Sequence, residues 1–206
     1  MNGPSAATEA TVRALAKVKD ARSAVLVEGI SDQIALEALA ARSGRDLMAE
    51  GVVILPIGGA SAITRYLMEL GPGGADLRLA GLCDVGEEDI FRRGLNRARI
   101  ASPQSRADME HLGFHVCVED LEDELLRATG TARAEAIFGS QGDLGSFRSL
   151  QRQPEWRGRL VDEQMRRFLG SGASRKLRYA RLLVESIELD RMPRPLNAVL
   201  AAVEPT

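Results

Sequence analysis

Residues 1–120 alternate short apolar runs with segments of helical periodicity, and this alternation constrains the fold more than any other feature of the sequence. The apolar runs are 23–28, 51–57, 77–83 and 114–118. Strands that are apolar on both faces are typical of a parallel sheet covered by helices on both sides. We therefore expect an α/β fold with a Rossmann-like, doubly wound parallel sheet. In such sheets ligands bind outside the carboxyl ends of the strands.

The length and composition predict one folded unit in three parts. The chain has 206 residues, of which 45% are hydrophobic, and this is enough for a sizeable core. Aromatic residues make up only 4%, so we expect a core of Leu, Val, Ile and Ala. Residues 1–20 are predicted to form an N-terminal helix, 21–130 the α/β core, and 131–206 a helical extension packed on that core.

Two helix starts can be predicted from capping residues. Ser31 or Asp32 is expected to cap the helix after the first strand. Ser105 and Asp108 have the spacing of a capping box, and they predict a short helix that ends at Gly113.

Several classes of protein are excluded or disfavoured. Cys83 and Cys117 lie in apolar runs and indicate buried thiols, and the two histidines have no spacing typical of a zinc site. The longest apolar stretch, 51–63, is interrupted by Pro and Gly and is too short to span a membrane. The first residues have no basic region followed by an apolar block, so we expect no secretory signal and a cytoplasmic protein.

Charge is segregated along the chain although the net charge is only −2. Residues 108–135 contain eight acidic and two basic residues, whereas residues 145–181 contain ten basic and three acidic residues. One interpretation is a metal site in the first segment and a phosphate-binding surface in the second. The alternative is that both segments are solvated helix faces.

Acidic residues follow three of the four predicted strands. Glu28 ends the first, Asp84 follows the third, and Glu119-Asp120 follows the fourth, while Asp32 lies in the first turn of the next helix. Each alone can be a polar strand end, a turn residue or a helix cap. Together they converge on one edge of the sheet, where their repulsion favours a hard divalent cation such as Mg²⁺, Mn²⁺ or Ca²⁺.

The segments Val27–Asp32 (Val-Glu-Gly-Ile-Ser-Asp), Leu82–Asp84 (Leu-Cys-Asp) and Asp120–Leu125 (Asp-Leu-Glu-Asp-Glu-Leu) resemble the motifs of the Toprim domain. The resemblance covers roughly residues 22–127 and is greatest to the OLD-family (overcoming lysogenisation defect) nucleases. Toprim domains occur in topoisomerases, bacterial primases and several nucleases. The resemblance therefore implies a Toprim-like sheet and chemistry on phosphodiester bonds.

The resemblance also implies roles for individual acidic residues. Glu28 matches the glutamate that binds metal or acts as general acid/base, and Asp32 matches an additional acidic ligand of OLD-type nucleases. Asp84 matches the first aspartate of an Asp-x-Asp motif. Glu122 and, less closely, Glu124 match the later acidic motif. The cofactor that this set implies is Mg²⁺ or Mn²⁺.

One position departs from the family pattern. The second aspartate of Asp-x-Asp is replaced by Gly86, and Glu87 or Glu88 is the candidate substitute ligand. This departure puts a two-metal site in doubt and leaves open a catalytically degenerate module.

The basic segment contains the expected contacts to nucleic acid. Lys176 resembles the carboxy-terminal lysine of OLD nucleases that stabilises phosphate charge, and Ser174 is its expected helix cap. Basic side chains at the start of a helix also suit an anion without reference to the family. The other predicted contacts are Arg157, Arg166, Arg167, Arg175 and Arg178. Trp156 is either a core residue or a platform for a base.

The chain is predicted to be a metal-dependent nuclease or nucleotidyl transferase that acts on nucleic acid, with DNA favoured over RNA. The alternative is a degenerate Toprim module that binds metal, nucleic acid or an ATPase partner. A hydrolase of small phosphate esters or nucleotides is a third possibility. Full OLD proteins carry an ATPase module, but no Walker A motif occurs in these 206 residues, so a separately encoded ATPase is a candidate partner.

Overall fold

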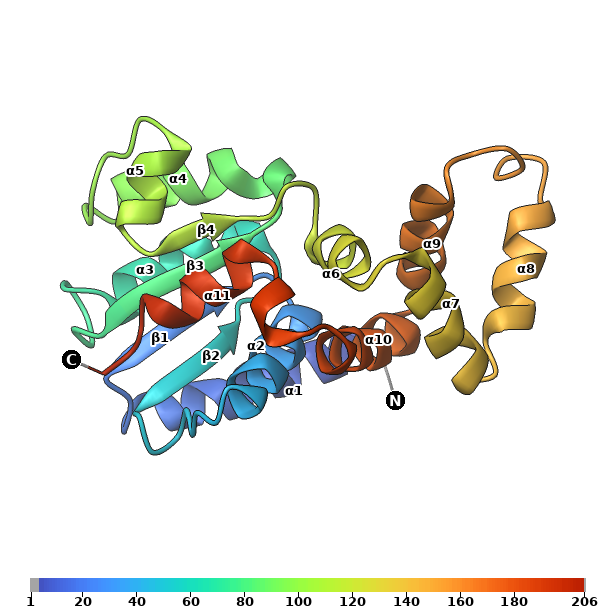
Figure 1. The fold of residues 1–206 in the computed structure, drawn as a ribbon. Helices are drawn as coiled ribbons and strands as arrows, with labels where there is room; N and C mark the ends of the chain where they lie inside the picture. The colour runs from blue at the N-terminus through green and yellow to red at the C-terminus, as the bar shows by residue number, and fades with distance from the viewer. Residues whose placement is uncertain (1–3, 206) are drawn as a thin grey trace.

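The computed structural model of the chain describes residues 4–205. Its centre is a parallel sheet of four strands in the order β2-β1-β3-β4 (Figure 1). The strands are β1 (Ser23–Val27), β2 (Val52–Pro56), β3 (Arg78–Cys83) and β4 (Phe114–Val116). The predicted doubly wound parallel sheet is therefore confirmed, although β4 ends two residues earlier than expected.

Alternate residues of each strand face two different hydrophobic clusters. On β1, Ala24 and Leu26 pack against one cluster, whereas Val25 and Val27 pack against the other. The first cluster receives α1 (Pro4–Val18), α3 (Ile63–Leu70), α4 (Glu88–Arg97) and α5 (Arg106–His111). The second receives α2 (Ile30–Arg42) and α11 (Arg194–Ala201), with helices that precede α11. Both sides of every strand are thus buried, which explains the nearly continuous apolar runs.

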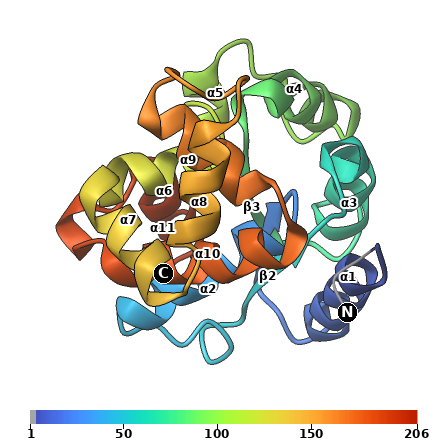
Figure 2. The ribbon, with the colours of Figure 1, turned by 90° about the vertical axis from the view of Figure 1, so that its right-hand side faces the viewer.

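The helical extension consists of α6 (Leu121–Thr129), α7 (Thr131–Ser140), α8 (Leu144–Arg152), α9 (Val161–Gly170) and α10 (Ala173–Ser186), followed by α11. Helices α7, α8 and α9 form a lobe beside the sheet, and α10 returns along α2 (Figure 1). Figure 2 shows this lobe in front of the sheet. The chain then closes with α11 against β3 and β4.

The lobe has an aromatic core. The rings of Phe138, Phe147, Phe168 and Tyr179 are fully buried, with centroids 5.1–5.3 Å apart in the contacting pairs. Three of the five phenylalanines of the chain therefore lie here. The expectation of a core built from Leu, Val, Ile and Ala holds for β1 and β2 but is wrong for the lobe, where a few large rings fill the space between short helices.

Two predicted helix caps are wrong and one is confirmed. Gly29 is the N-cap of α2, and Asp32 is the third residue of that helix, where its carboxylate accepts a hydrogen bond from the Gly29 amide at 2.9 Å. Gly172, and not Ser174, is the N-cap of α10, because the Lys176 amide donates to the Gly172 carbonyl. The capping box of Ser105 and Asp108 is present at α5.

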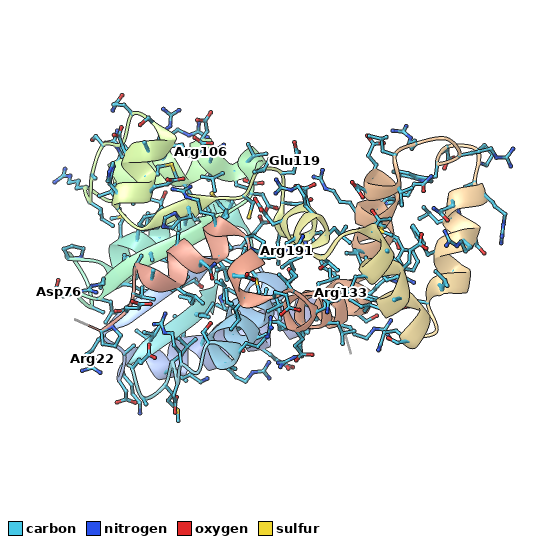
Figure 3. The ribbon with its side chains drawn as sticks, in the orientation of Figure 1. Arg22, Asp76, Arg106, Glu119, Arg133 and Arg191 are labelled. Atoms are coloured by element: carbon cyan, nitrogen blue, oxygen red, sulfur yellow. The ribbon has the colours of Figure 1, made fainter. Side chains whose placement is uncertain are left out.

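The two ends of the sheet have different surroundings. Arg22 and Asp76, which precede β1 and β3, lie at the end away from the lobe, whereas Glu119 lies at the end toward it (Figure 3). The carboxyl ends of the strands therefore face α6 and the lobe. The two cysteines are buried free thiols, as predicted. Within residues 4–205, no helix has the length and hydropathy needed to cross a membrane.

Candidate functional site

Strand register brings the acidic strand ends together. Val27 at the end of β1 is paired with Leu82 of β3, so Glu28 lies opposite Cys83 and one residue from the level of Asp84. Neighbouring strands are about 4.8 Å apart. Asp120 follows β4 and caps α6, since its Oδ1 accepts a hydrogen bond from the Asp123 amide at 2.8 Å. This cap directs Glu122 of α6 toward the same edge.

Four carboxylates form what we call the carboxylate cluster: Glu28, Asp32, Asp84 and Glu122. Burial, followed by the charges of the other three carboxylates and of Asp120, raises the pKa of Asp84 to about 7. Burial likewise raises the pKa of Asp32 to about 6, against the opposing influence of Lys176 and the Gly29 amide. These effects show that the four groups, from β1, α2, β3 and α6, share one electrostatic environment.

The pKa values of the other two carboxyls of the cluster, Glu28 and Glu122, are also raised. Burial raises the pKa of Glu28, and the nearby charge of Glu87 adds to that rise. Burial also raises the pKa of Glu122, although Lys176 opposes it. The site therefore disfavours negative charge unless a cation is added.

Lys176 is the one basic side chain that enters the carboxylate cluster among the described residues. Its Nζ lies 3.3 Å from the Glu122 Oε2. Burial lowers the pKa of Lys176, but Glu122, Asp32 and Asp84 outweigh burial, so the net pKa is raised and the ammonium is retained. Because α10 packs along α2, a residue far along the chain completes a site that begins at β1.

The chemistry of the cluster suits a hard divalent cation. All its donors are carboxylate oxygens, which Mg²⁺ and Mn²⁺ prefer, and four carboxylates face a single ammonium. No three His, Cys, Asp or Glu side chains within residues 4–205 are grouped closely enough to hold one ion together. The donor set thus fits such an ion in kind and charge, but the described side chains do not form a ligand shell around one point.

Two predicted ligands are engaged elsewhere. Glu88 accepts hydrogen bonds from Arg106 at 3.0 and 2.5 Å. Glu124 accepts a hydrogen bond from the Val118 amide at 2.8 Å and pairs with Arg127 at 2.7 Å. The geometry does not favour either residue as a ligand.

The position of the missing aspartate is open. A Cβ atom built on Gly86 meets no other atom within 4 Å, so an acidic side chain would fit there. Glu87 is close enough to raise the pKa of Glu28, whereas its neighbour Glu88 is paired with Arg106. Of the two candidate substitutes, Glu87 is therefore the better placed.

The predicted basic contacts fall into two groups. Arg166 pairs with Asp120 at 2.6 Å, Arg178 pairs with Asp143, and Arg175 lies over the Phe168 ring at 4.1 Å. These three hold the lobe together. Arg157 and Arg167 are exposed; Arg157 donates to a backbone carbonyl, and Arg167 has no partner within the described part of the chain.

A pocket that the sequence did not predict adjoins the carboxylate cluster. It has a volume of about 520 Å³ and lies between α6, α9 and α10, and we call it the α9 pocket. Its lining includes Glu122, Trp156, Arg159, Arg166, Arg167 and Lys176. The excess of basic residues in 145–181 was a signal for this surface, but the sequence could not show that it meets the acidic residues.

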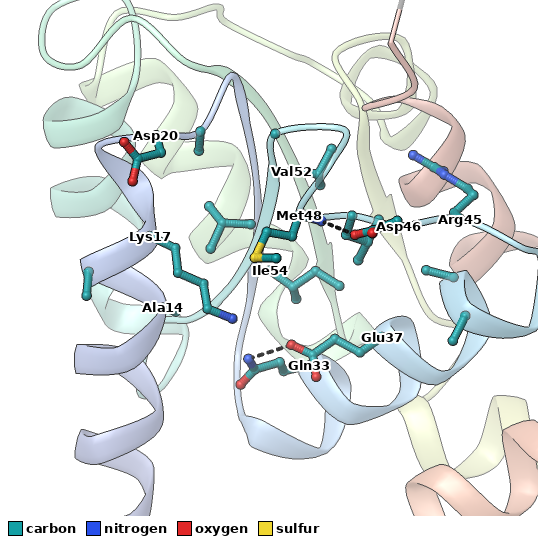
Figure 4. Close-up of a pocket in the computed structure, with 17 residues that line it drawn as sticks. Ala14, Lys17, Asp20, Gln33, Glu37, Arg45, Asp46, Met48, Val52 and Ile54 are labelled. Atoms are coloured by element: carbon teal, nitrogen blue, oxygen red, sulfur yellow. Dashed lines mark hydrogen bonds between the residues drawn. The ribbon is translucent and has the colours of Figure 1, made fainter.

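A second pocket, of about 540 Å³, lies beside β2 between α1 and α2 (Figure 4). Some of its polar side chains are already engaged: Gln33 donates to Glu37 at 2.9 Å, and Arg45 binds Glu50, which lies outside the lining, at 2.6 Å. None of the predicted site residues lines it. We therefore place the functional site at the carboxyl ends of the strands.

The comparisons with known proteins concern the sequence pattern of one segment and the fold. Residues 21–71 match the model of the family described as "Overcoming lysogenization defect protein-like, TOPRIM domain". This segment includes β1, α2 and β2, and with them Glu28 and Asp32. No curated protein matches the chain.

Solved structures of OLD proteins have a similar fold. The C-terminal region of the Xanthomonas campestris pv. campestris OLD protein, phased with platinum, is 24% identical, covers 91% of this chain and 94% of its own, and gives a TM-score of 0.68. The C-terminal region of the Burkholderia pseudomallei OLD protein is 19% identical, with coverages of 89% and 97% and a TM-score of 0.66. These similarities confirm the expected resemblance. The chain is therefore a Toprim-like α/β protein whose residues 21–71 carry the OLD-like Toprim sequence pattern.

Proposed function

We propose that this chain is a Mg²⁺- or Mn²⁺-dependent nuclease that hydrolyses phosphodiester bonds of nucleic acid, with DNA as the favoured substrate. The observation that carries the proposal is the convergence of four carboxylates from separate elements with a single lysine, Lys176, at the edge of the sheet. A structural salt bridge would need one carboxylate for one lysine. Of the other three carboxylates, Asp32 accepts a hydrogen bond from the Gly29 amide, whereas the side chains of Glu28 and Asp84 have no hydrogen bond or ion pair within residues 4–205.

The residues of the cluster and Lys176 would have different roles in the reaction. Glu28, Asp32 and Asp84 would hold the cation, which supplies positive charge next to the phosphate when bound. Glu28 is half-buried with a raised pKa, so its carboxyl is suited to accept or donate a proton at the reacting oxygen. Lys176 would exchange Glu122 for a phosphate oxygen and stabilise the negative charge that develops there.

Cleavage of single-stranded and plasmid DNA with Mg²⁺ or Mn²⁺ tests the proposal. Glu28→Gln keeps the shape of the side chain and should lower the rate by about 10²–10⁴-fold, the usual contribution of general acid/base catalysis. Glu69→Gln on the exposed face of α3 is the matched control and should leave the rate unchanged. Equal cleavage by the wild type and Glu28→Gln would remove Glu28 from the site.

Gly86 supports the alternative of a degenerate module that binds metal, nucleic acid or an ATPase partner. The variant Gly86→Asp separates the two, because the added side chain meets open space and the Gly86 backbone is not in the left-handed region. If the wild type is active, the variant should bind a metal ion more tightly and cleave faster. An inactive wild type with an active Gly86→Asp would instead favour the degenerate module.

A hydrolase of small phosphate esters predicts a different result. Charge reversal at Arg167 would spare such an enzyme, because Arg167 is exposed and lies on α9 outside the carboxylate cluster. A nuclease that holds a long strand should lose affinity on the same change. Comparing cleavage of DNA with that of a chromogenic phosphate monoester decides between them.

A further inference from the structure

We infer that the α9 pocket takes up one unstacked base of the strand whose phosphate lies at Lys176, so that the preferred substrate is single-stranded or frayed nucleic acid. This inference rests on the proposed function and names the form of its substrate. It adds a role for Trp156 and Arg159, which lie outside the carboxylate cluster.

The pocket and the cluster share two side chains. Glu122 and Lys176 both line the pocket. Glu122 is also a member of the carboxylate cluster, and Lys176 contacts Glu122. A phosphate held at Lys176 would therefore place an adjoining nucleotide at the mouth of the pocket. The volume of about 520 Å³ lies within the range of about 300–1,000 Å³ that is typical of small-ligand pockets, so there is room for a nucleotide.

Trp156 is held in position at the pocket by packing and by a backbone hydrogen bond. It is half-buried and packs against the larger hydrophobic cluster, and its carbonyl accepts a hydrogen bond from Gln164 at 2.8 Å. The Arg159 guanidinium lies over the indole ring, 5.1 Å from its centroid. Arg159 is held by the Glu155 carbonyl at 2.8 Å and by Glu163 at only 4.0 Å. Indole and guanidinium planes are the surfaces on which proteins stack unpaired bases.

Three acidic residues, Asp120, Glu122 and Glu163, line the pocket together with four basic ones, so an unpaired cation decides where a phosphate on the far side of that base can bind. Arg166 is neutralised by Asp120, but Arg167 is exposed and has no partner among residues 4–205. Arg167 is therefore available for a backbone phosphate. A base in an intact duplex is paired and stacked and cannot reach Trp156 unless it is first extruded. The stacking platform thus selects for an unpaired strand.

The single tryptophan of the chain provides a direct test that does not depend on cleavage. Wild-type protein in EDTA is titrated with a fluorescein-labelled oligothymidylate, with the same strand in a duplex, and with a strand of abasic sites. Anisotropy measures binding and Trp156 fluorescence measures stacking. We expect strong quenching by the single strand only. Binding of the single strand without quenching, or equal quenching by the duplex, would overturn the inference.

Variants separate stacking from charge. Trp156→Ala should weaken binding of the single strand about ten-fold or more, and Trp156→Phe should restore most of it. Arg167→Ala should lower the salt dependence of binding by about one phosphate contact. Arg97→Ala is the matched control, because Arg97 is also an exposed basic residue in the last turn of a ten-residue helix. An equal loss for Arg97→Ala and Arg167→Ala would contradict the role of the pocket.

Failure of the inference can be told apart from failure of the proposed function. Mg²⁺-dependent cleavage without Trp156 quenching would retain the nuclease and remove the base pocket. Quenching by the single strand without any metal-dependent cleavage would retain the pocket and indicate a non-catalytic module that binds nucleic acid.

Discussion

The acidic edge of the sheet and the basic lobe differ in how far their charges are paired within the protein. In the lobe and at the start of α10, Arg166, Arg175 and Arg178 contact acids, a ring or backbone carbonyls, so most of the positive charge is used within the protein. At the edge of the sheet, four carboxylates have one lysine between them. The edge therefore has surplus negative charge that the described residues do not neutralise, whereas most of the positive charge of the lobe is paired.

This difference shows why charge counts alone mislead. The lobe looks like a phosphate-binding surface in sequence, yet Arg175 lies over Phe168 and stabilises the aromatic core. The excess of cations that remains for a polyanion is small and is concentrated at Arg157 and Arg167. The sheet edge, in contrast, has fewer charged residues but a larger imbalance.

The first prediction concerns the connection between the two regions. Phe138→Ala in the lobe and Phe91→Ala under the sheet each empty a fully buried site and should each lower the free energy of unfolding by about 3–5 kcal/mol. The larger hydrophobic cluster runs from the sheet through α2 and α10 into the lobe, so we expect one transition for both. Urea titrations followed by Trp156 fluorescence and by circular dichroism check this. Separate midpoints for the two probes would show that the lobe unfolds independently.

The second prediction tests the link that α10 provides. Lys176→Ala removes the one cation that the described residues place in the carboxylate cluster and should lower the rate of cleavage by about 10²–10³-fold, or about 2.7–4 kcal/mol in transition-state stabilisation. Arg181→Ala on the same helix is the control, because Arg181 is exposed and pairs only with Glu185. Steady-state cleavage rates at saturating DNA measure the effect. A similar loss for both variants would indicate damage to α10 and no specific role for Lys176.

The third prediction concerns the free energy of unfolding and how the close, buried carboxylates make it depend on pH. The pKa of Asp84 is about 7 in the folded state, well above its ordinary value, so the folded state binds more protons than the unfolded state between about pH 4 and pH 7. The free energy of unfolding should therefore fall as the pH rises through this range. Asp84→Asn should flatten that fall and, since Asp84 is partly exposed, stabilise the metal-free protein at pH 8 by about 1–2 kcal/mol.

Metal binding should have the opposite effect on the stability of the protein at high pH. Mg²⁺ or Mn²⁺ should raise the melting temperature of the wild type at pH 8, because the ion binds the folded state only. The increase should be smaller in Asp84→Asn. A melting temperature that Mg²⁺ and Mn²⁺ leave unchanged in the wild type would contradict a metal site at this edge.

The sheet could be predicted from the sequence because its signals are local. Each strand is a continuous apolar run and each carboxylate follows its strand directly, so parallel register alone brings Glu28 and Asp84 to the same edge. The wrong caps of α2 and α10 have a shared cause. Glycine leaves no side-chain signal, and the Asp32 carboxylate accepts from the Gly29 amide from inside the helix.

The lobe could not be predicted in the same way because its contacts are between distant residues. Asp143 accepts a hydrogen bond from Tyr179 at 2.9 Å, across 36 positions of the chain. The sequence around neither residue contains a motif that predicts this contact. Outside the lobe, Glu88 is also bound by a distant residue, Arg106 of α5, whereas Glu124 is bound by the nearby Val118 amide, six positions away. Motif matching assigned them to the metal, whereas tertiary packing uses them for structure.

The smallest predicted effect distinguishes two adjacent arginines of α9. Arg166 is held by Asp120 at 2.6 Å and by Glu119 at 3.6 Å, and its substitution by Ala should cost at most about 1 kcal/mol of stability, because the pair is partly exposed. Arg167→Ala should leave stability unchanged but reduce affinity for DNA. Thermal melts and binding isotherms on the two variants measure both quantities. If Arg166→Ala alone reduced affinity for DNA, the ion pair between Arg166 and Asp120 would have to open when nucleic acid binds. The positive charge of the lobe would then also serve a ligand from outside the chain.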